Sequence, residues 1–289
     1  MEATGEVFSD EYMFAKSRLE ELERDVEDWT ETIDYSDVNK ELPWDICVAA
    51  KNNSIQKVLD WLGPLPVDKQ RINSKTPKAM NFTLVHFAAT YKHTDLLSIL
   101  LQLGADVDPV DAMGMTAIVQ VGKDPECHAQ ARLLLEWGAE ISNCALVSKD
   151  QIEAELQSGN HKLANLVKSE FGGRRCEVMN LPNRPDLIGK TCVVEKYLPD
   201  KGRYKVIFEA SKEVGLVGPE NLKRRDRTPD DCGYYVTYKN IRTTRHEFAS
   251  KEECQAFIAS LTKEEGDRSR DQIDTAAEAR AEEAAAFAR

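Results

Sequence analysis

The chain has 289 residues, 42% hydrophobic and 30% charged, enough apolar material for one large or two modest packed domains. Fifty acidic against 38 basic residues give a net charge of -12, which argues against general binding to nucleic acid or anionic membranes. The apolar runs are far shorter than the roughly 20 residues needed to cross a bilayer, and the opening MEATGEVFSDEY is no signal peptide. We expect an intracellular, cytoplasmic protein, with an organelle or cytoskeletal assembly left open, and neither secretion nor membrane insertion.

The charge is distributed unevenly along the chain. Residues 1–45 hold 15 acids and 4 bases, whereas residues 172–228 hold 13 bases and 8 acids. The last stretch, residues 262–289, holds 8 acids and 5 bases. This distribution, together with the patterns below, predicts five parts: an acidic helical arm (1–41), a body (42–171), a basic module (172–228), a ββα unit (229–262) and a charged helical tail (263–289).

Both ends of the chain predict helices. Residues 9–30 predict an acidic amphipathic helix, whose apolar side chains near one face are Met13, Leu19, Leu22, Val26 and Trp29. Such a helix either packs on the first part of the body or offers its apolar face to a partner. The tail is rich in Ala, Glu and Arg and helix-prone but has no heptad seam, so a solvated helix and a partner-docked helix both stay open.

A helical pattern recurs within residues 42–171. Thr83 matches Thr116, and the segment beginning at Gly104 matches the one beginning at Gly138. A repeat period of about 33 residues predicts a solenoid of stacked helix pairs. Two further short helices, the first with Ser148 as N-cap and Glu153 in its opening turns, would close the stack.

The string TLVHFAA, from Thr83 to Ala89, resembles the T-P-L-H-x-A-A helix opener of the ankyrin-repeat family. WDICVAAKNNSIQKVLDWLG before it and GMTAIVQVGKDPECHAQARLLLEWGAEIS after it resemble degenerate copies. The resemblance implies about three repeats and structural roles for Thr83 and His86.

The same resemblance implies that protein partners bind at the finger tips, residues 78–82 and 111–115, and at the inner-helix end, residues 91–93. The candidate partner-binding residues are Met80, Phe82, Tyr91, His93, Met113 and Met115. For each of them an ordinary surface role is the competing interpretation.

From Gly172 the pattern changes to short strands: CEVMNL, TCVVEKYL, GRYKVIF and VGLVGPENL. Arg184-Pro185, the G-R-Y-x-V string from Gly202 and the P-E-N-L string from Pro219 resemble a small SH3-like β-barrel module. Modules of this kind bind peptides, methylated side chains or RNA, and the candidate surface residues are Tyr197, Arg203, Lys223, Arg224 and Arg225. Tyr204 and Phe208 lie on one strand face, and we expect them to fill the barrel core.

Residues 232–261 predict two strands, GYYVTYKN and TRHEF, followed by a helix with a capping box of Ser250 and Glu253. The unit has too little core to stand alone. We expect it to dock on the barrel or on another protein.

No catalytic, cofactor-binding or metal-binding motif is found. The seven cysteines are spread along the chain and form no C-x-x-C pair, so zinc-module spacing is absent, and reduced, buried cysteines are favoured. His246 lies near Cys254, but no third orienting group accompanies them.

The sequence as a whole predicts a multidomain α and β protein: an ankyrin-repeat α-solenoid, a small SH3-like barrel and a ββα unit, with helical termini. The function favoured is a non-catalytic protein-binding adaptor, or an accessory or scaffold subunit of a larger complex, docked through its barrel and terminal helices. It would need no cofactor or small-molecule substrate. The alternative is an RNA-associated factor that uses the basic barrel.

Overall fold

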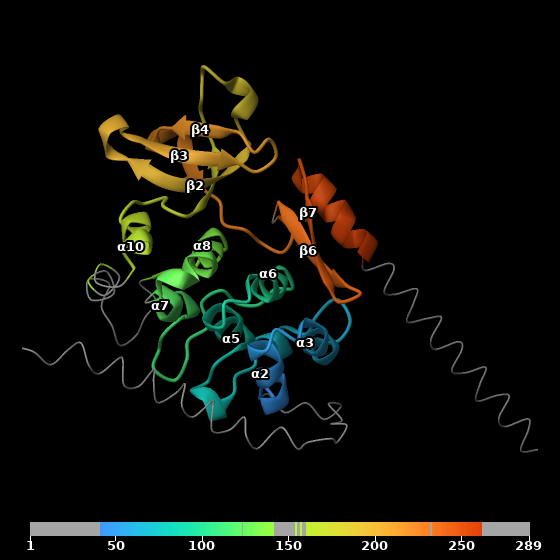
Figure 1. Ribbon diagram of the computed structural model, residues 1–289. Helices are drawn as coiled ribbons and strands as arrows, with labels where there is room; N and C mark the ends of the chain where they lie inside the picture. Colours follow the sequence, from blue (N-terminus) through green and yellow to red (C-terminus); the bar gives the residue numbers. More distant parts are fainter. Residues whose placement is uncertain are drawn as a thin grey trace, which may run out of the picture.

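The computed structural model describes residues 41–122, 124–141, 154, 157, 160–231 and 233–261. The predicted helices of the arm and of the tail lie outside these residues, as do Ser148 and Glu153 of the predicted cap. Figure 1 shows a layer of helices with a β-sheet at one end of it and a hairpin and helix along its side.

Within the described residues, three helix pairs follow one another. They are α2 (Trp44–Lys51) with α3 (Ile55–Leu62), α5 (Leu84–Thr90) with α6 (Thr94–Gln102), and α7 (Ala117–Gly122) with α8 (His128–Glu136). The first helices contact one another in the order α2, α5, α7, and α6 contacts α8. This stacking covers α6 on more than one side, which leaves Leu96, Leu97 and Leu100 without exposed surface.

Two glycines end helices where the chain must turn. Gly104 follows α6 with φ 95° and Gly138 follows α8 with φ 99°, a left-handed region that other residues enter at a cost. The two glycines therefore end the second helices of two successive helix pairs.

Short elements join the helix pairs to one another and to the sheet. They are α4 (Lys69–Ile72), η1 (Pro77–Ala79), η2 (Pro125–Cys127) and α10 (His161–Val167). The side chain of Asn160 accepts the N–H of Leu163 and so caps α10. Because α10 contacts both α8 and β2, it lies between the third helix pair and the sheet.

The basic module forms an antiparallel five-stranded sheet of order β4-β3-β2-β1-β5. Its strands are β1 (Arg175–Val178), β2 (Thr191–Leu198), β3 (Arg203–Phe208), β4 (Val214–Val217) and β5 (Leu222–Arg224), with turns at η3 (Pro185–Leu187), η4 (Pro199–Lys201) and η5 (Pro219–Asn221). Tyr204 and Phe208 are buried in its core, as expected. The closed barrel is not confirmed, because β4 and β5 form opposite edges of the sheet.

The last described unit is a hairpin with a helix packed on it. β6 (Tyr234–Lys239) pairs with β7 (Arg242–Glu247). The helix of residues 251–261 begins at the predicted capping box: the hydroxyl of Ser250 accepts the N–H of Glu253, whose carboxylate accepts the N–H of Ala249. Phe257 of this helix packs on the rings of Tyr235, His246 and Phe248.

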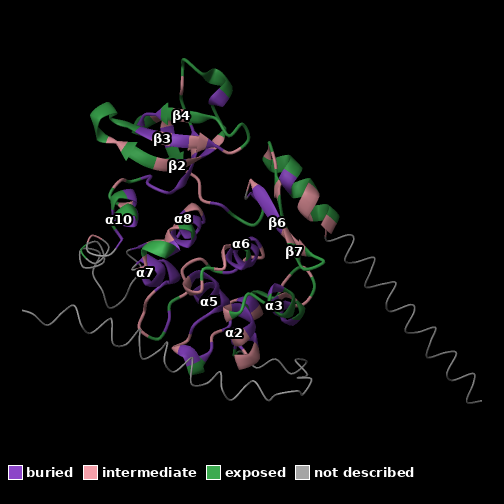
Figure 2. Cartoon of the chain, in the orientation of Figure 1, coloured by how far each residue is buried: buried purple, intermediate pink, exposed green. Residues whose placement is uncertain are grey.

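The ββα unit packs on the helical layer, which corrects the expectation that it docks on the barrel or on another protein. Tyr234, Tyr235 and Val236 share one hydrophobic core with the three helix pairs, whereas the sheet has a core of its own. Figure 2 shows β6 buried beside α6. The side chain of Gln102 donates to the carbonyl of Val236 at 2.5 Å and accepts its N–H at 2.8 Å. Gln102 thereby supplies to the outer edge of β6 the bonds that a neighbouring strand would make.

Replacing Gln102 by Leu should destabilise the protein by roughly 2–3 kcal/mol, because the buried N–H and C=O of Val236 lose their partner. Urea unfolding would measure this difference. Gln70→Leu, at an exposed position of α4, is the matched control and should change stability by less than about 0.5 kcal/mol. Equal effects would show that the bonds to Val236 do not hold the hairpin.

Buried ion pairs join the sheet, the linker after β5 and α8. Arg227, with its side chain 2% exposed, contacts Glu136 of α8 at 2.8 Å and Glu209 at 2.6 Å. Arg175 of β1 contacts Glu209 at 2.7 Å and Asp231 at 3.3 Å. Burial opposes ionisation of Glu209, but the charges of Arg227 and Arg175 outweigh it and hold the pKa of this carboxyl below its ordinary value.

Two further arginines bind the carboxyl end of α8. Arg174 donates to the carbonyls of Leu135 and Ala139, and Arg224 donates to that of Gly138 and contacts Glu140 at 2.5 Å. Cations are favoured at this end of a helix, where carbonyls lack intrahelical partners. The sheet is thus fixed against the last turn of α8.

Arg227→Met should cost about 3–5 kcal/mol of stability, because it leaves Glu136 and Glu209 with less neutralising charge in a buried site. Arg184→Met is the control: Arg184 also contacts two carboxylates, of Asp186 and Glu213, but at an exposed position, where we expect a far smaller effect. Chemical denaturation of both variants measures the contrast, and similar losses would contradict the assigned role of burial.

Candidate protein-binding surface

Two finger-like loops precede the first helices of the second and third pairs. Thr76 and Phe82 form an antiparallel bridge at the base of the first finger, and Val110 and Thr116 form the same bridge at the second. Val110 follows Thr76, and Thr116 follows Phe82, by the same number of residues. The N–H of Ala112 donates to the carbonyl of Met80 at 2.7 Å, so the two fingers are linked side by side.

Thr83 and His86 fix the first finger to the helix behind it, as predicted. The N–H of Thr83 donates to Nδ1 of His86 at 3.2 Å, so Nδ1 is unprotonated. Nε2 then carries the proton and bonds the carbonyl of Met115, in the second finger, at 3.3 Å. Burial lowers the pKa of His86 to about 4. A neutral imidazole therefore joins the two fingers near neutral pH.

Asp111 shapes the second finger. One carboxylate oxygen accepts the N–H groups of Met113 and Met115, and the other accepts the side chain of Gln120 at 2.6 Å. Burial raises the pKa of Asp111, with these hydrogen bonds acting in the opposite direction. Val119 occupies the place corresponding to His86, so the carboxylate of Asp111 and Gln120 connect finger to helix in this repeat.

The six candidate finger residues do not all lie at the surface. Met80, Met113 and Met115 are half-buried at the two fingers. Phe82 is 5% exposed and packs on the rings of His86 and Phe87. Its assignment as a partner-contacting residue is therefore corrected: the bridge at the finger base turns its side chain into the core.

Tyr91 and His93 lie beyond the end of α5 and are half-buried. Lys51 lies over the Tyr91 ring, and Nε2 of His93 contacts the carbonyl of Lys51 at 2.5 Å. Both residues connect the second pair to the first. Lys92, between them, contacts Asp124 and Glu126, which lie between α7 and α8 of the next helix pair, so this turn also holds neighbouring pairs together.

The candidate residues on the sheet do not form one basic platform. Tyr197 is 38% exposed and Arg203 and Lys223 are exposed. Arg224 and Arg225, however, contact carboxylates of the chain itself: Glu140 and Asp226 for the first, Glu177 and Asp231 for the second. Two of the four basic side chains expected at an RNA surface are therefore engaged internally.

The residues with reactive side chains have structural surroundings. The five described cysteines, Cys47, Cys127, Cys176, Cys192 and Cys254, are buried, and Cys144 and Cys232 lie outside the described residues. Burial raises the pKa of Cys47 to about 12, which keeps its thiol protonated. His246 contacts the hydroxyl of Thr237 and packs on Phe257. Among the described residues, no group of three or more acidic, histidine or cysteine side chains is arranged to hold a metal ion.

Sequence reasoning did not find the arginines that fix the sheet to the helices. Arg174, Arg175 and Arg227 are buried, although the composition of their segment suggests a solvated basic surface. One signal in the sequence could have found them. Acids stand among the bases in KRRDR (223–227) and follow them in DD (230–231), and such mixed charge is also what internal ion pairs require.

The geometry of the second helix pair agrees with the comparison to known families. Residues 80–112 match the ankyrin repeat. The match covers the end of the first finger, the helices α5 and α6 and the beginning of the second finger. No curated protein matches the chain. None of the described helices is long and apolar enough to span a membrane.

The neutral state of His86 predicts an acid-sensitive stability. Its pKa lies at about 4 in the folded protein against an ordinary value of 6.5, so only the unfolded chain takes up this proton between those values. The contribution of His86 to the free energy of unfolding should be fully present above pH 6.5. It should fall by up to roughly 3 kcal/mol as the pH drops to 4, and titration of His86 should cause no further loss below pH 4.

Unfolding free energies at pH 7 and pH 4.5, compared between the wild type and His86→Gln, would test this. The variant lacks the titrating group, so its loss between the two pH values should be smaller. An equal loss in both proteins would place the acid sensitivity elsewhere.

Proposed function

We propose that this protein is a non-catalytic adaptor, or an accessory subunit of a larger assembly, which binds a protein partner on its fingers. The match of residues 80–112 to the ankyrin repeat carries the proposal, because that match suggests a role in protein–protein interaction. In this proposal the pairs α2–α3 and α7–α8 are divergent copies of the same repeat. The repeated finger bridges and helix-ending glycines support them as copies.

The side chains at the fingers suit binding to an apolar partner surface. Three methionines, Met80, Met113 and Met115, lie on two adjacent fingers and are half-buried. The flexible methionine side chain adapts to differently shaped partners, while the bonds of Asp111 and His86 hold the backbone beneath it. A rigid backbone that carries adaptable apolar side chains lowers the ordering cost of association.

The remaining parts would serve as anchors in the assembly. We propose that the sheet is an SH3-like module whose main contacts are made within this chain, through Arg174 and Arg224, and that the terminal segments provide further docking. The free, buried thiols of Cys47, Cys127, Cys176 and Cys192 support an intracellular setting.

Substitutions at the fingers should abolish partner binding without unfolding the protein. We expect Met113→Asp with Lys78→Glu to reduce recovery of the main partner at least about 10-fold, because a charge is placed in the apolar contact and a rim charge is reversed. The measurement is quantitative co-purification from the native organism, followed by titration of the purified partner.

The matched control is Met179→Asp with Lys196→Glu, the same substitutions at exposed positions on the sheet module. It should retain the partner. All variants should unfold at the wild-type denaturant concentration. If the finger variant keeps its partner while the sheet variant loses it, the finger surface is not the binding site.

A further inference from the structure

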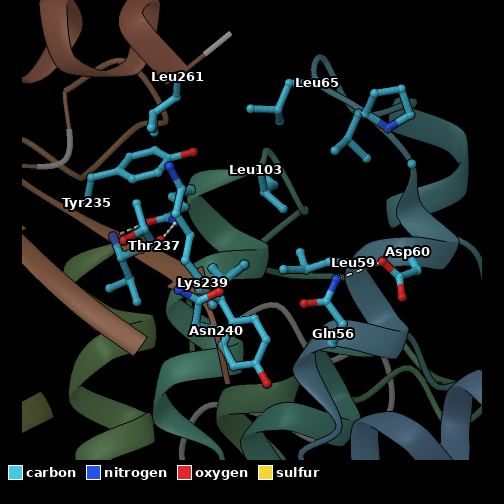
Figure 3. A pocket seen from close by; sticks show the side chains of 17 residues that line it. Gln56, Leu59, Asp60, Leu65, Leu103, Tyr235, Thr237, Lys239, Asn240 and Leu261 are labelled. Atoms are coloured by element: carbon cyan, nitrogen blue, oxygen red, sulfur yellow. Dashed lines mark hydrogen bonds between the residues drawn. The ribbon is translucent and has the colours of Figure 1, made fainter. Parts of the chain in front are cut away.

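A groove of about 670 Å³ lies between the second helices of the first two pairs and the hairpin. Figure 3 shows its apolar side chains converging: Leu59 of α3, Leu103 directly after α6 and Tyr235 of β6, with Leu65 and Leu261 across from Leu59. Its polar lining includes Gln56, Asp60, Lys239 and Asn240. An apolar floor with a polar rim is the surface that an amphipathic segment covers.

The hairpin beside this groove ends in an unusual turn. Lys239 pairs with Arg242, which leaves a two-residue loop of Asn240 and Ile241 with φ 53° and 63°. This turn type favours glycine at its second position, and a β-branched residue there is strained. Ile241 is nevertheless 87% exposed, so its side chain gains little within the described residues. Asn240, the neighbour of Ile241 in this turn, lines the groove, and a strained, exposed apolar residue beside an apolar groove points to a contact made with another segment.

We propose that residues 9–30 of this same chain occupy the groove, with their apolar side chains on its floor and against Ile241. This segment lies outside the described residues and has the required character: its sequence places Leu19, Leu22, Val26 and Trp29 at helical spacing along one face. The proposal concerns the second helices and the hairpin, and it does not depend on binding at the fingers.

Charge and chain length agree with this occupant. Residues 9–30 hold 8 acids and 3 bases, and the two residues that flank the exposed turn, Lys239 and Arg242, are basic and exposed. The described chain begins at Glu41, which bridges to Lys75 beside the first helix pair, and α3 of that pair forms one wall of the groove. The ten or so residues between the segment and Glu41 reach up to roughly 33 Å when extended.

An attached segment has an advantage over a separate partner. A flexible linker of this length holds it at an effective concentration on the order of millimolar, so modest affinity suffices to fill the groove. The arm would therefore cover the outer side of the helix pairs while leaving the fingers accessible.

Hydrogen exchange on the full chain tests the proposal. Leu22→Asp with Trp29→Asp should speed amide exchange in residues 59–67 and 235–242 by at least about 10-fold, because the groove loses its cover. Ser17→Asp with Ser9→Asp adds the same two charges at positions outside the apolar face and should leave the groove protected. Exchange in the sheet, residues 191–208, should be the same in all proteins.

The variant Ile241→Gly gives a second test, in which a change in exchange cannot be attributed to misfolding of the hairpin. Glycine adopts this turn without strain, so the hairpin itself should stay formed. The groove amides should nevertheless exchange at least about 5-fold faster, because the contact of the Ile241 side chain with the arm is lost.

The results that overturn the proposal are equally definite. Unchanged groove exchange in the Leu22 and Trp29 variant means that the arm does not bind there. Groove protection that rises with protein concentration, with a doubled mass in light scattering, means that a second copy fills the groove. Faster hairpin exchange in Ile241→Gly with unchanged exchange in residues 59–67 means that Ile241 acts only on its own turn.

Discussion

The position of Arg227 between two carboxylates is the constraint on which the arrangement of the described parts depends. Its guanidinium contacts Glu136 at the end of α8 and Glu209 beyond β3, so it fixes the sheet to the third helix pair. Arg227 also precedes the hairpin in the chain, and its guanidinium lies over the ring of Tyr234 in β6. This contact helps to direct the hairpin toward α6. Because burying ions costs much of what their attraction returns, we attribute to this network the orientation of the parts rather than a large net stabilisation.

This orientation divides the surface of the helix pairs. The hairpin covers part of α6, and Gln102 closes the edge of β6, so the outer side is partly occupied by the chain itself. The fingers precede the first helices α5 and α7, and His86 and Asp111 hold them in place. The fingers are therefore the surface on which the proposed protein partner would bind, and the groove is the surface that the proposed arm would fill.

The sequence predicted well the features that depend on neighbouring residues. The capping box at Ser250 and the burial of Tyr204 follow from spacing or strand alternation within a few residues. The docking of the hairpin could not be predicted in this way, because it rests on a contact between Gln102 and Val236, which are 134 residues apart. Phe82 was misassigned for a related reason: its position in a finger is evident from the repeat, but the direction of its side chain depends on how the finger folds back.

The basic character of residues 172–228 shows why segment charge is a poor guide to surface charge here. Arg175 and Arg227 neutralise carboxylates inside the protein, and Arg224 and Arg225 neutralise others near its surface. Much of the positive charge of the module is thus matched within the described chain. The acidic residues of the arm have no such excess of bases nearby in sequence, and lowering their mutual repulsion requires cations from elsewhere in the structure or from a partner. In the proposed contact, the exposed bases on either side of the Asn240–Ile241 turn would supply such cations to the arm.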